Sequence, residues 1–413
     1  MLEVAYESTM ARQTAVNDAA TAEVGCATGG GPIRVMFFHT SLFVGGAESL
    51  LVDLIRRLDR TRFAPEVCCL KDIGPLGRTL VDEVPIFHGF IRHKYDLPVV
   101  ARLARLLRRR RIDAIVTVGA GDKMFWGRLA ARLAGVPVVA AALHSTGWPD
   151  GISRLNRLLT PLTDAFIAVA EPHARYLVEQ EKLPRQKVRV VINGIDTDRF
   201  RPRPPDAVLR ESLGIPRDAP LAGIVARLSR EKNHEMFLEV ARRVRERAPK
   251  AHFLIVGEGI DRDRLEQHAR QLGVADCVHF VGNRPDVPEL LALLDVFLLT
   301  SHIEASPVSI LEALATGKPV VATRVGSVSE TVAHGEVGYL VEPDDAAGMA
   351  EHTVELFADA RLAQLLGTRG RRLVVERASV DRMVEGYQDL LEQLHRNKQR
   401  RDPLRSAHRT RQE

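Results

Sequence analysis

Charged side chains in the second half of the chain have the types and spacing of a site for a phosphorylated sugar. Glu304 and Glu312 are separated by seven residues, and Arg227 and Lys232 precede them. Two carboxylates can accept hydrogen bonds from sugar hydroxyls, and two cations can neutralise a diphosphate. Each residue also has an ordinary interpretation, because acids and cations are common on solvated loops and helices. Their positions relative to predicted strands therefore decide between the two interpretations.

Both acids fall within one predicted strand–loop–helix unit. The apolar run Val296–Thr300 predicts a buried parallel strand, and the polar turn that follows it contains Glu304. Glu312 lies in the second turn of a helix predicted over Val308–Thr316. Parallel sheets bind ligands beyond the carboxyl ends of their strands, which is where this unit places Glu304.

The start of that helix adds a predicted anion site. The first N–H groups of a helix have no intrahelical partner, so the backbone at Val308 and Ser309 would face a phosphate between the two acids. Gly317 ends the helix, and Lys318–Ala322 predicts the next buried strand.

Arg227 and Lys232 lie on the loop after another predicted strand, Leu221–Val225. This loop belongs to the same sheet edge as Glu304, where two cations can hold a diphosphate without a metal. A solvated basic loop explains either cation alone. It explains less well why both cations and both acids map to one edge.

The first half of the chain carries a strand–glycine turn–helix unit of its own. Ile33–His39 predicts a strand, and the turn after it contains Gly46, where backbone N–H groups can face a phosphate or hydroxyl. The turn is not a G-x-G-x-x-G dinucleotide fingerprint. His144 follows the predicted strand Val136–Leu143, a position that makes a site role as reasonable as a structural one.

Strands and helices alternate through both halves, and this predicts an α/β protein with two doubly wound, Rossmann-like domains facing across a cleft. The length of 413 residues is too great for one ordinary core. The proline-rich stretch Arg199–Pro220 marks the predicted boundary. The expected parts are a disordered leader at 1–31, an N-terminal domain at 32–200, a C-terminal domain at 201–378 and a basic disordered tail at 395–413.

The composition excludes several classes. With 45% hydrophobic and 27% charged residues, the chain has the profile of a globular protein, and its formal net charge of +5 favours anionic partners. Aromatic residues are not interleaved with basic ones, which argues against a nucleic-acid partner. The four cysteines form no C-x-x-C pair, so no metal site is expected. This use of cysteine is typical of a protein in the reducing cytoplasm. No secretory signal or membrane-spanning run is present.

A basic amphipathic helix is predicted over Leu97–Arg111, and it has two interpretations. It can lie on an anionic membrane surface. Alternatively, its arginines complement the helix dipole at a solvated end, and the strand that follows directly favours this second interpretation. The helix, an exposed Trp126 and the basic tail together support only a hypothesis of peripheral contact with the inner face of the membrane.

The set of residues resembles the retaining GT-B glycosyltransferases of family 4, the glycosyl transferases group 1. The resemblance covers about residues 33–394. It is carried by Arg227 with Glu231-Lys232-Asn233, the pair Glu304 and Glu312, Gly317-Lys318-Pro319-Val320-Val321, Gly45-Gly46-Ala47-Glu48, and Asn193-Gly194-Ile195-Asp196.

The resemblance implies a nucleotide-sugar donor as substrate, bound mainly by the C-terminal domain, with no cofactor and no metal. Arg227 and Lys232 would neutralise the diphosphate, Glu304 would face the donor sugar, and Glu312 would face the ribose. The N–H groups at Val308 and Ser309 would contact phosphate.

The resemblance also implies roles in the first domain. Gly46 would let its backbone close on the donor, and His144 would lie near the reacting carbons. A last helix at 379–394 would pack back onto this domain. Three departures, Ala305, Ser327 and the Val308-Ser309 pair, leave the identity of the sugar open.

The predicted activity is metal-independent transfer of a sugar to an acceptor hydroxyl with retention, in the synthesis of a cell-surface glycan or glycolipid. Whether Glu304 is a nucleophile or a sugar contact stays open. A retaining glycoside hydrolase is a poor alternative, because its two carboxyls must flank one bond ~5–5.5 Å apart. A nucleotide-sugar epimerase and a non-catalytic nucleotide-sugar-binding protein are the remaining alternatives.

Overall fold

A computed structural model describes residues 31–93, 96–119, 124–144 and 152–401. The chain divides into a unit of residues 1–32 and a unit of residues 33–413, and the fold described below is that of the second unit. The predicted leader at 1–31 lies almost wholly outside the described residues.

The first sheet has seven parallel strands in the order β3-β2-β1-β4-β5-β6-β7. Strands in the middle of this sheet are apolar runs buried on both faces, as parallel sheets covered by helices require. The strands are β1 Ile33–His39, β2 Phe63–Cys69, β3 Ile86–Phe87, β4 Ala114–Val118, β5 Val138–Ala142, β6 Ala165–Ala168 and β7 Val188–Val190. The helices are α2 Gly46–Arg57, α3 Gly74–Arg78, α4 Val99–Arg109, α5 Met124–Ala134, α6 Ile152–Leu158 and α7 Glu171–Glu179, with 3-10 turns at 160–162 and 185–187.

The second sheet has six parallel strands in the order β10-β9-β8-β11-β12-β13. The strands are β8 Leu221–Val225, β9 His252–Val256, β10 Val278–Gly282, β11 Val296–Leu299, β12 Val320–Thr323 and β13 Gly338–Val341. The helices are α8 Ala207–Ser212, α9 His234–Arg247, α10 Arg262–Gln271, α11 Val287–Leu293, α12 Val308–Ala315, α13 Val328–Thr331, α14 Ala346–Ala358 and α15 Ala360–Arg377, with a 3-10 turn at 230–232. The prediction of two doubly wound α/β domains is therefore confirmed.

Each sheet has one point at which the strand order reverses. In the first sheet this switch point lies between β1 and β4, and in the second sheet between β8 and β11. Neighbouring strands there lead to helices on opposite faces, which leaves a crevice at their carboxyl ends. The loops after β8 and β11 carry Arg227, Lys232 and Glu304, so the topology brings the predicted donor residues to one switch point.

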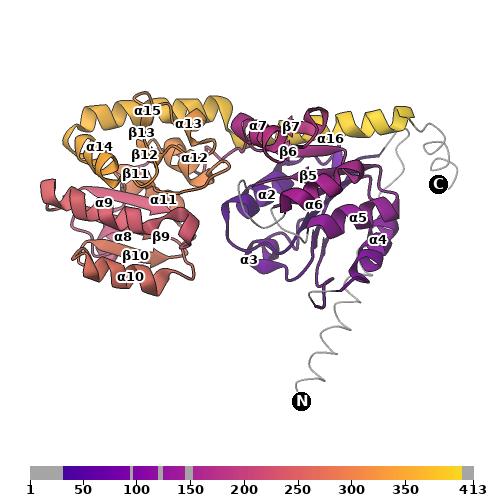
Figure 1. Cartoon of the computed structure of the whole chain (residues 1–413), viewed down its shortest axis with the longest axis horizontal. Coiled ribbons are helices and arrows are strands. Elements are labelled where there is room, and N and C mark those ends of the chain that lie inside the picture. Colours follow the sequence, from indigo (N-terminus) through magenta and orange to yellow (C-terminus); the bar gives the residue numbers. More distant parts are fainter. Residues whose placement is uncertain (1–30, 94–95, 120–123, 145–151, 402–413) are drawn as a thin grey trace, which may run out of the picture. The chain divides into compact units, whose positions relative to one another are not determined.

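The last helix, α16 (Val380–Arg401), lies against elements of the first domain (Figure 1). Its apolar side joins the core that contains Val35, Phe37 and Leu54. The expectation of a disordered tail from residue 395 is wrong over 395–401, because the helix continues to Arg401. There Lys398 Nζ forms a 2.7 Å ion pair with Asp164. Residues 402–413 lie outside the described residues.

One local expectation needs correction, and the boundary stretch has a feature of its own. Trp126 is half-buried rather than exposed, because it packs against the core around Met36 and its ring lies 4.3 Å from that of Phe125. The proline-rich boundary stretch contains the short helix α8, which begins where the Asp206 carboxylate accepts hydrogen bonds from the Val208 and Leu209 N–H groups.

Leu391 of α16 tests how far the first domain depends on this helix. Its side chain is fully buried, so Leu391→Ala should lower the free energy of unfolding by about 2–5 kcal/mol through lost burial and a cavity. Urea denaturation followed by circular dichroism measures this. Leu133→Ala, at a side chain that is 54% exposed, is the matched control, and an equally small effect at both positions would contradict the packing of α16.

Candidate active site

The loop that carries Glu304 is fixed by hydrogen bonds to its neighbours. The His302 N–H donates to the Glu231 carbonyl (2.8 Å), and the Thr300 hydroxyl donates to the Lys232 carbonyl (2.9 Å). The Thr323 hydroxyl donates to the Ser301 carbonyl (2.6 Å). Three loop segments at the carboxyl edge of the second sheet are thereby joined before any ligand binds.

Gly326 and Ser327 contact the backbone of the loop that carries Glu304. Gly326 has φ +53°, and a Cβ there would lie 1.7 Å from the Glu304 carbonyl oxygen, so only glycine allows this approach. The Ser327 hydroxyl donates to the Ala305 carbonyl. Ser327 and Ala305 are two of the positions at which the sequence departs from the family pattern. The bond between them gives Ser327 a local structural role.

Lys232 and Glu304 form the central ion pair of the site. The Lys232 Nζ lies 2.6 Å from Glu304 Oε1, and the Ser301 hydroxyl donates to the same oxygen at 2.7 Å. The Glu304 side chain is only 7% exposed and that of Lys232 is 22% exposed. A carboxylate this deep must be paired, and the loop bonds described above hold its partner in place.

Arg227 lies apart from this pair. Its guanidinium bonds the Glu231 carboxylate at 2.8 Å, and its side chain is 67% exposed. Its loop is nevertheless anchored, because the adjacent Leu228 N–H donates to the Glu258 carbonyl (3.0 Å). The structure thus brings Lys232 to Glu304 but leaves Arg227 on the open side of the same loop.

Glu312 lies in a different environment. Burial raises the pKa of its carboxyl to about 7, although the charge of Arg199 opposes the shift and that of Asp53 adds to it. Asp53 itself has a raised pKa, again mainly because of burial. Glu312 therefore holds a proton over a range of pH in which an ordinary glutamate is ionised, and it forms no ion pair with Lys232.

The start of α12 approaches the start of α2. A Cβ on Gly46 would lie 3.2 Å from Val308 Cγ2, so the absence of a side chain at Gly46 allows this approach. Pro307 occupies the N-cap with an extended backbone, and no side chain among the described residues caps the helix. The N–H groups of Val308 and Ser309 are therefore available to an anion.

His144 follows β5 on the carboxyl edge of the first sheet. Burial lowers its pKa to about 3, with smaller contributions from the charges of His173 and His39. Burial also lowers the pKa of His173 to about 4 and depresses that of His39. The sequence analysis missed His39 and His173, although His39 is the last residue of a predicted strand and that position was a usable signal.

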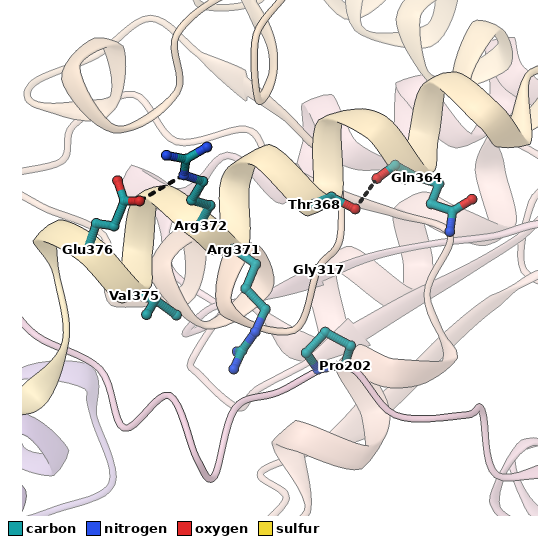
Figure 2. Close-up of a pocket in the computed structure, with 8 residues that line it drawn as sticks. All are labelled: Pro202, Gly317, Gln364, Thr368, Arg371, Arg372, Val375 and Glu376. Carbon is teal, nitrogen blue, oxygen red and sulfur yellow. Dashed lines mark hydrogen bonds and ion pairs between the residues drawn. The ribbon is translucent and has the colours of Figure 1, made fainter.

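The pocket shown in Figure 2 is distinct from this site. It measures about 570 Å³ and lies beside α15. Its lining residues are Pro202, Gly317, Gln364, Thr368, Arg371, Arg372, Val375 and Glu376. None of the predicted site residues lines it, and its cations are engaged: Arg371 donates to the Phe200 carbonyl (2.9 Å), and Arg372 pairs with Glu376 (2.7 Å).

Within the described ranges, no cluster of three or more His, Cys, Asp or Glu side chains is arranged to hold a metal ion. No helix in the described part of the chain is long and apolar enough to cross a membrane.

Comparisons with known proteins agree with this fold. Two parallel α/β domains, each with one strand-order reversal, are the architecture of the GT-B glycosyltransferases. The chain belongs to glycosyltransferase family 4: residues 44–199 match the model of that family, and residues 206–373 match that of the glycosyl transferases group 1.

Among relatives, the GDP-mannose-dependent α-(1-6)-phosphatidylinositol monomannoside mannosyltransferase of Mycobacterium tuberculosis (strain H37Rv) is 30% identical over 375 residues, which are 84% of this chain and 94% of the relative. The UDP-Gal:α-D-GlcNAc-diphosphoundecaprenol α-1,3-galactosyltransferase of Escherichia coli is 26% identical over 86% of this chain and 96% of its own. Both names describe transferases, which supports transfer rather than the epimerase alternative.

Solved structures show the same fold. HepE from Anabaena in complex with UDP-glucose superposes with a TM-score of 0.79 at 23% identity, covering 87% of this chain and 99% of that one. WaaG, a glycosyltransferase involved in lipopolysaccharide biosynthesis, gives a TM-score of 0.68 at 18% identity, covering 86% and 99%.

The raised pKa of Glu312 predicts a pH effect on stability. In the unfolded state the pKa of the Glu312 carboxyl is about 4.3, whereas in the native state it is about 7. The native state therefore binds more protons between these two pH values. As a result, the free energy of unfolding falls as pH rises through this range. Glu312→Gln removes the loss, so its stability relative to the parent should rise by about 1–3 kcal/mol between pH 5 and pH 8. Urea titrations at both pH values measure this. The exposed substitution Glu336→Gln should show no such trend, and a trend shared by both variants would refute the assignment.

Proposed function

We propose that this glycosyltransferase moves a sugar from a nucleoside diphosphate to an acceptor hydroxyl with retention and without a metal ion. The observation that carries the proposal is the Lys232–Glu304 pair (2.6 Å), set beside the uncapped start of α12 at the switch point of the second sheet. One cation and a set of N–H donors for phosphate, next to a carboxylate for a sugar, match the parts of a nucleotide sugar.

The charge that develops in the reaction explains this arrangement. Cleavage of the anomeric bond leaves negative charge on the departing diphosphate and positive charge on the sugar ring. Lys232, the α12 N-terminus and Arg227 stabilise the diphosphate more strongly in the transition state than before it. Arg227 is exposed, so it has to leave Glu231 and turn toward the donor to contribute.

Retention follows from attack by the acceptor on the face that the diphosphate leaves, with a leaving phosphate oxygen taking the proton of the acceptor. Glu304 is better suited to contact the sugar than to act as a nucleophile, because its Oε1 already accepts bonds from Lys232 and Ser301. In this proposal the half-buried Glu312 faces the ribose, and His144 lies near the reacting carbons.

The relatives narrow the substrate class. Their names specify GDP-mannose or UDP-galactose as donors and a phosphatidylinositol mannoside or a diphosphoundecaprenol-linked sugar as acceptors. We extend these classes to this chain: a nucleotide sugar as donor, and a lipid-linked glycan at the cytoplasmic face of the membrane as acceptor.

Helix α4 offers a surface for that membrane. Arg102 and Arg110 are occupied within the fold by Asp96 and Glu66. Arg105, Arg109 and Arg111 are exposed and have no ion-pair partner among the described residues. The three free arginines support peripheral electrostatic contact with anionic lipid.

Loss of Lys232 or Arg227 should slow transfer. Lys232→Ala should reduce the rate with saturating donor by ~10²-fold or more, and Arg227→Ala should reduce it less because its side chain is solvated. Nucleoside diphosphate release from a panel of UDP- and GDP-sugars measures the rate. The parent protein should also gain thermal stability from the diphosphate alone, and Lys232→Ala should lose much of that gain.

Lys250→Ala and Arg270→Ala remove exposed cations elsewhere in the second domain and serve as controls. Full transfer by the double variant Arg227→Ala/Lys232→Ala would refute the charge-stabilisation mechanism. A parent protein that no nucleoside diphosphate stabilises would refute the donor assignment itself.

Membrane contact should depend on charge. Binding to vesicles that contain phosphatidylglycerol should fall steeply as salt rises from low to physiological strength, and neutral vesicles should bind little protein. Each arginine near an anionic surface contributes about 1 kcal/mol, so replacing Arg105, Arg109 and Arg111 with alanine should weaken binding by ~10²-fold. Cosedimentation measures this. The same triple change at Arg361, Arg369 and Arg377 of α15 is the control, and equal losses in both variants would contradict a role for α4.

A further inference from the structure

The switch point of the first sheet carries a polar pair that the donor site does not use. His39 is the last residue of β1, and Gly119 follows the last residue of β4. These are the strands between which the order reverses, so their carboxyl ends border the crevice of this sheet. Glu48, in the first turn of α2, reaches the same place: its Oε1 lies 3.6 Å from the Nε2 of His39.

The two ring nitrogens of His39 are in different situations. Nδ1 is engaged by Ser41, whose carbonyl oxygen lies at 2.9 Å and whose N–H lies at 3.2 Å. Nε2 faces Glu48 at a distance too long for a good hydrogen bond. The side chain of His39 is only 9% exposed, and the contacts of Nδ1 with Ser41 fix the orientation of the ring. Nε2 and the Glu48 carboxylate remain incompletely bonded to each other.

Two glycines pack against the polar ends of this pair. A Cβ on Gly119, which has φ +110°, would lie 3.3 Å from His39 Nε2. A Cβ on Gly45 would lie 2.3 Å from Glu48 Oε2. Side chains at these positions would crowd the imidazole and the carboxylate, so the absence of a side chain at each glycine allows the two polar groups to hold their places.

The chemistry of the pair selects a hydroxyl. If Nδ1 donates to the Ser41 carbonyl, Nε2 accepts; if Nδ1 accepts from the Ser41 N–H, Nε2 donates. A hydroxyl suits both tautomers because it donates and accepts, and it can bond Glu48 at the same time. A phosphate would meet the negative charge of Glu48 in either case. Burial lowers the pKa of His39, so the ring adds no compensating positive charge near neutral pH.

We propose that His39 and Glu48 bind a hydroxyl of the acceptor, and that the part of the acceptor held at this switch point is an uncharged sugar. This inference rests on the proposed transferase function. It assigns the uncharged end of the acceptor to the first domain and leaves the anionic donor to the second domain. His144, whose pKa is affected by the charge of His39, lies on the same edge, beside this hydroxyl site.

Substitution of His39 by asparagine or by glutamine distinguishes the contributions of its two ring nitrogens. In His39→Asn the amide reaches about as far as Nδ1, so the contact with Ser41 can persist while Nε2 is lost. In His39→Gln the amide reaches about as far as Nε2. Glu48→Gln keeps the shape of the side chain and removes its charge.

The full-length protein, loaded with UDP, is titrated with neutral n-octyl hexosides and separately with n-octyl phosphate, and binding is followed by saturation-transfer NMR. Hexoside affinity should fall about tenfold or more in His39→Asn and Glu48→Gln, and less in His39→Gln. His352→Gln, at a histidine that pairs with Glu355 (3.2 Å) in the second domain, should behave like the parent. The thermal stabilisation by UDP should be the same in all four variants.

Unchanged hexoside affinity in His39→Asn would overturn the inference, as would tighter binding of n-octyl phosphate than of any hexoside. Failure of every hexoside to bind the parent while UDP still stabilises it would also overturn the inference and leave the proposed donor site intact. Absence of stabilisation by UDP and the other nucleoside diphosphates in the parent would count against the proposed function instead.

Discussion

The Lys232–Glu304 ion pair is the interaction on which the geometry of the candidate site in the second domain depends. Glu304 is almost fully buried on a loop, where an unpaired carboxylate would be strongly destabilising. Its partner comes from a different loop, so the pair forms only if β8 and β11 are adjacent and both loops keep their paths. The bonds from His302 to Glu231 and from Thr300 to Lys232 maintain those paths. The Lys232–Glu304 part of the site is therefore preorganised, whereas Arg227 has to turn toward a donor.

The two sheets use the same topology for different chemistry. In each, the order of parallel strands reverses once, and the loops at that point carry the groups available to a ligand. The second sheet offers an ammonium and the start of α12, both suited to an anion. The first offers His39 with Glu48, both suited to a neutral hydroxyl. A transferase needs both environments, since one substrate carries a diphosphate and the other must present an uncharged nucleophile.

The parallel strands and the proximity of Lys232 to Glu304 could be predicted from the sequence. Apolar runs such as Val296–Thr300 specify buried parallel strands, and the edge rule then places Lys232 near Glu304. The orientation of the Arg227 side chain could not be predicted, because local geometry decides which carboxylate a solvated side chain on a short loop contacts. Here that carboxylate is Glu231. His39 was missed although its place at the end of a predicted strand was a usable signal, because no spacing pattern marks a single histidine there. The length of α16 was underestimated because its last turns are basic, and their anchor, Asp164, is distant in the sequence.

Glu304 and Glu312 of the strand–loop–helix unit have different properties because their surroundings differ. Glu304 lies against an ammonium and a serine hydroxyl, so its charge is fixed in a defined direction. Glu312 is half-buried. Its burial and the nearby Asp53 carboxyl raise its pKa to about 7, and the charge of Arg199 offsets this only in part. A carboxyl with that pKa can be protonated in the empty site and can donate as well as accept hydrogen bonds near neutral pH. A ribose diol presents two hydroxyls that also donate and accept, and Glu312 is suited to it in either protonation state. In the proposed function, Glu304 instead places an ion-paired carboxylate close to the sugar ring, which becomes positive during transfer.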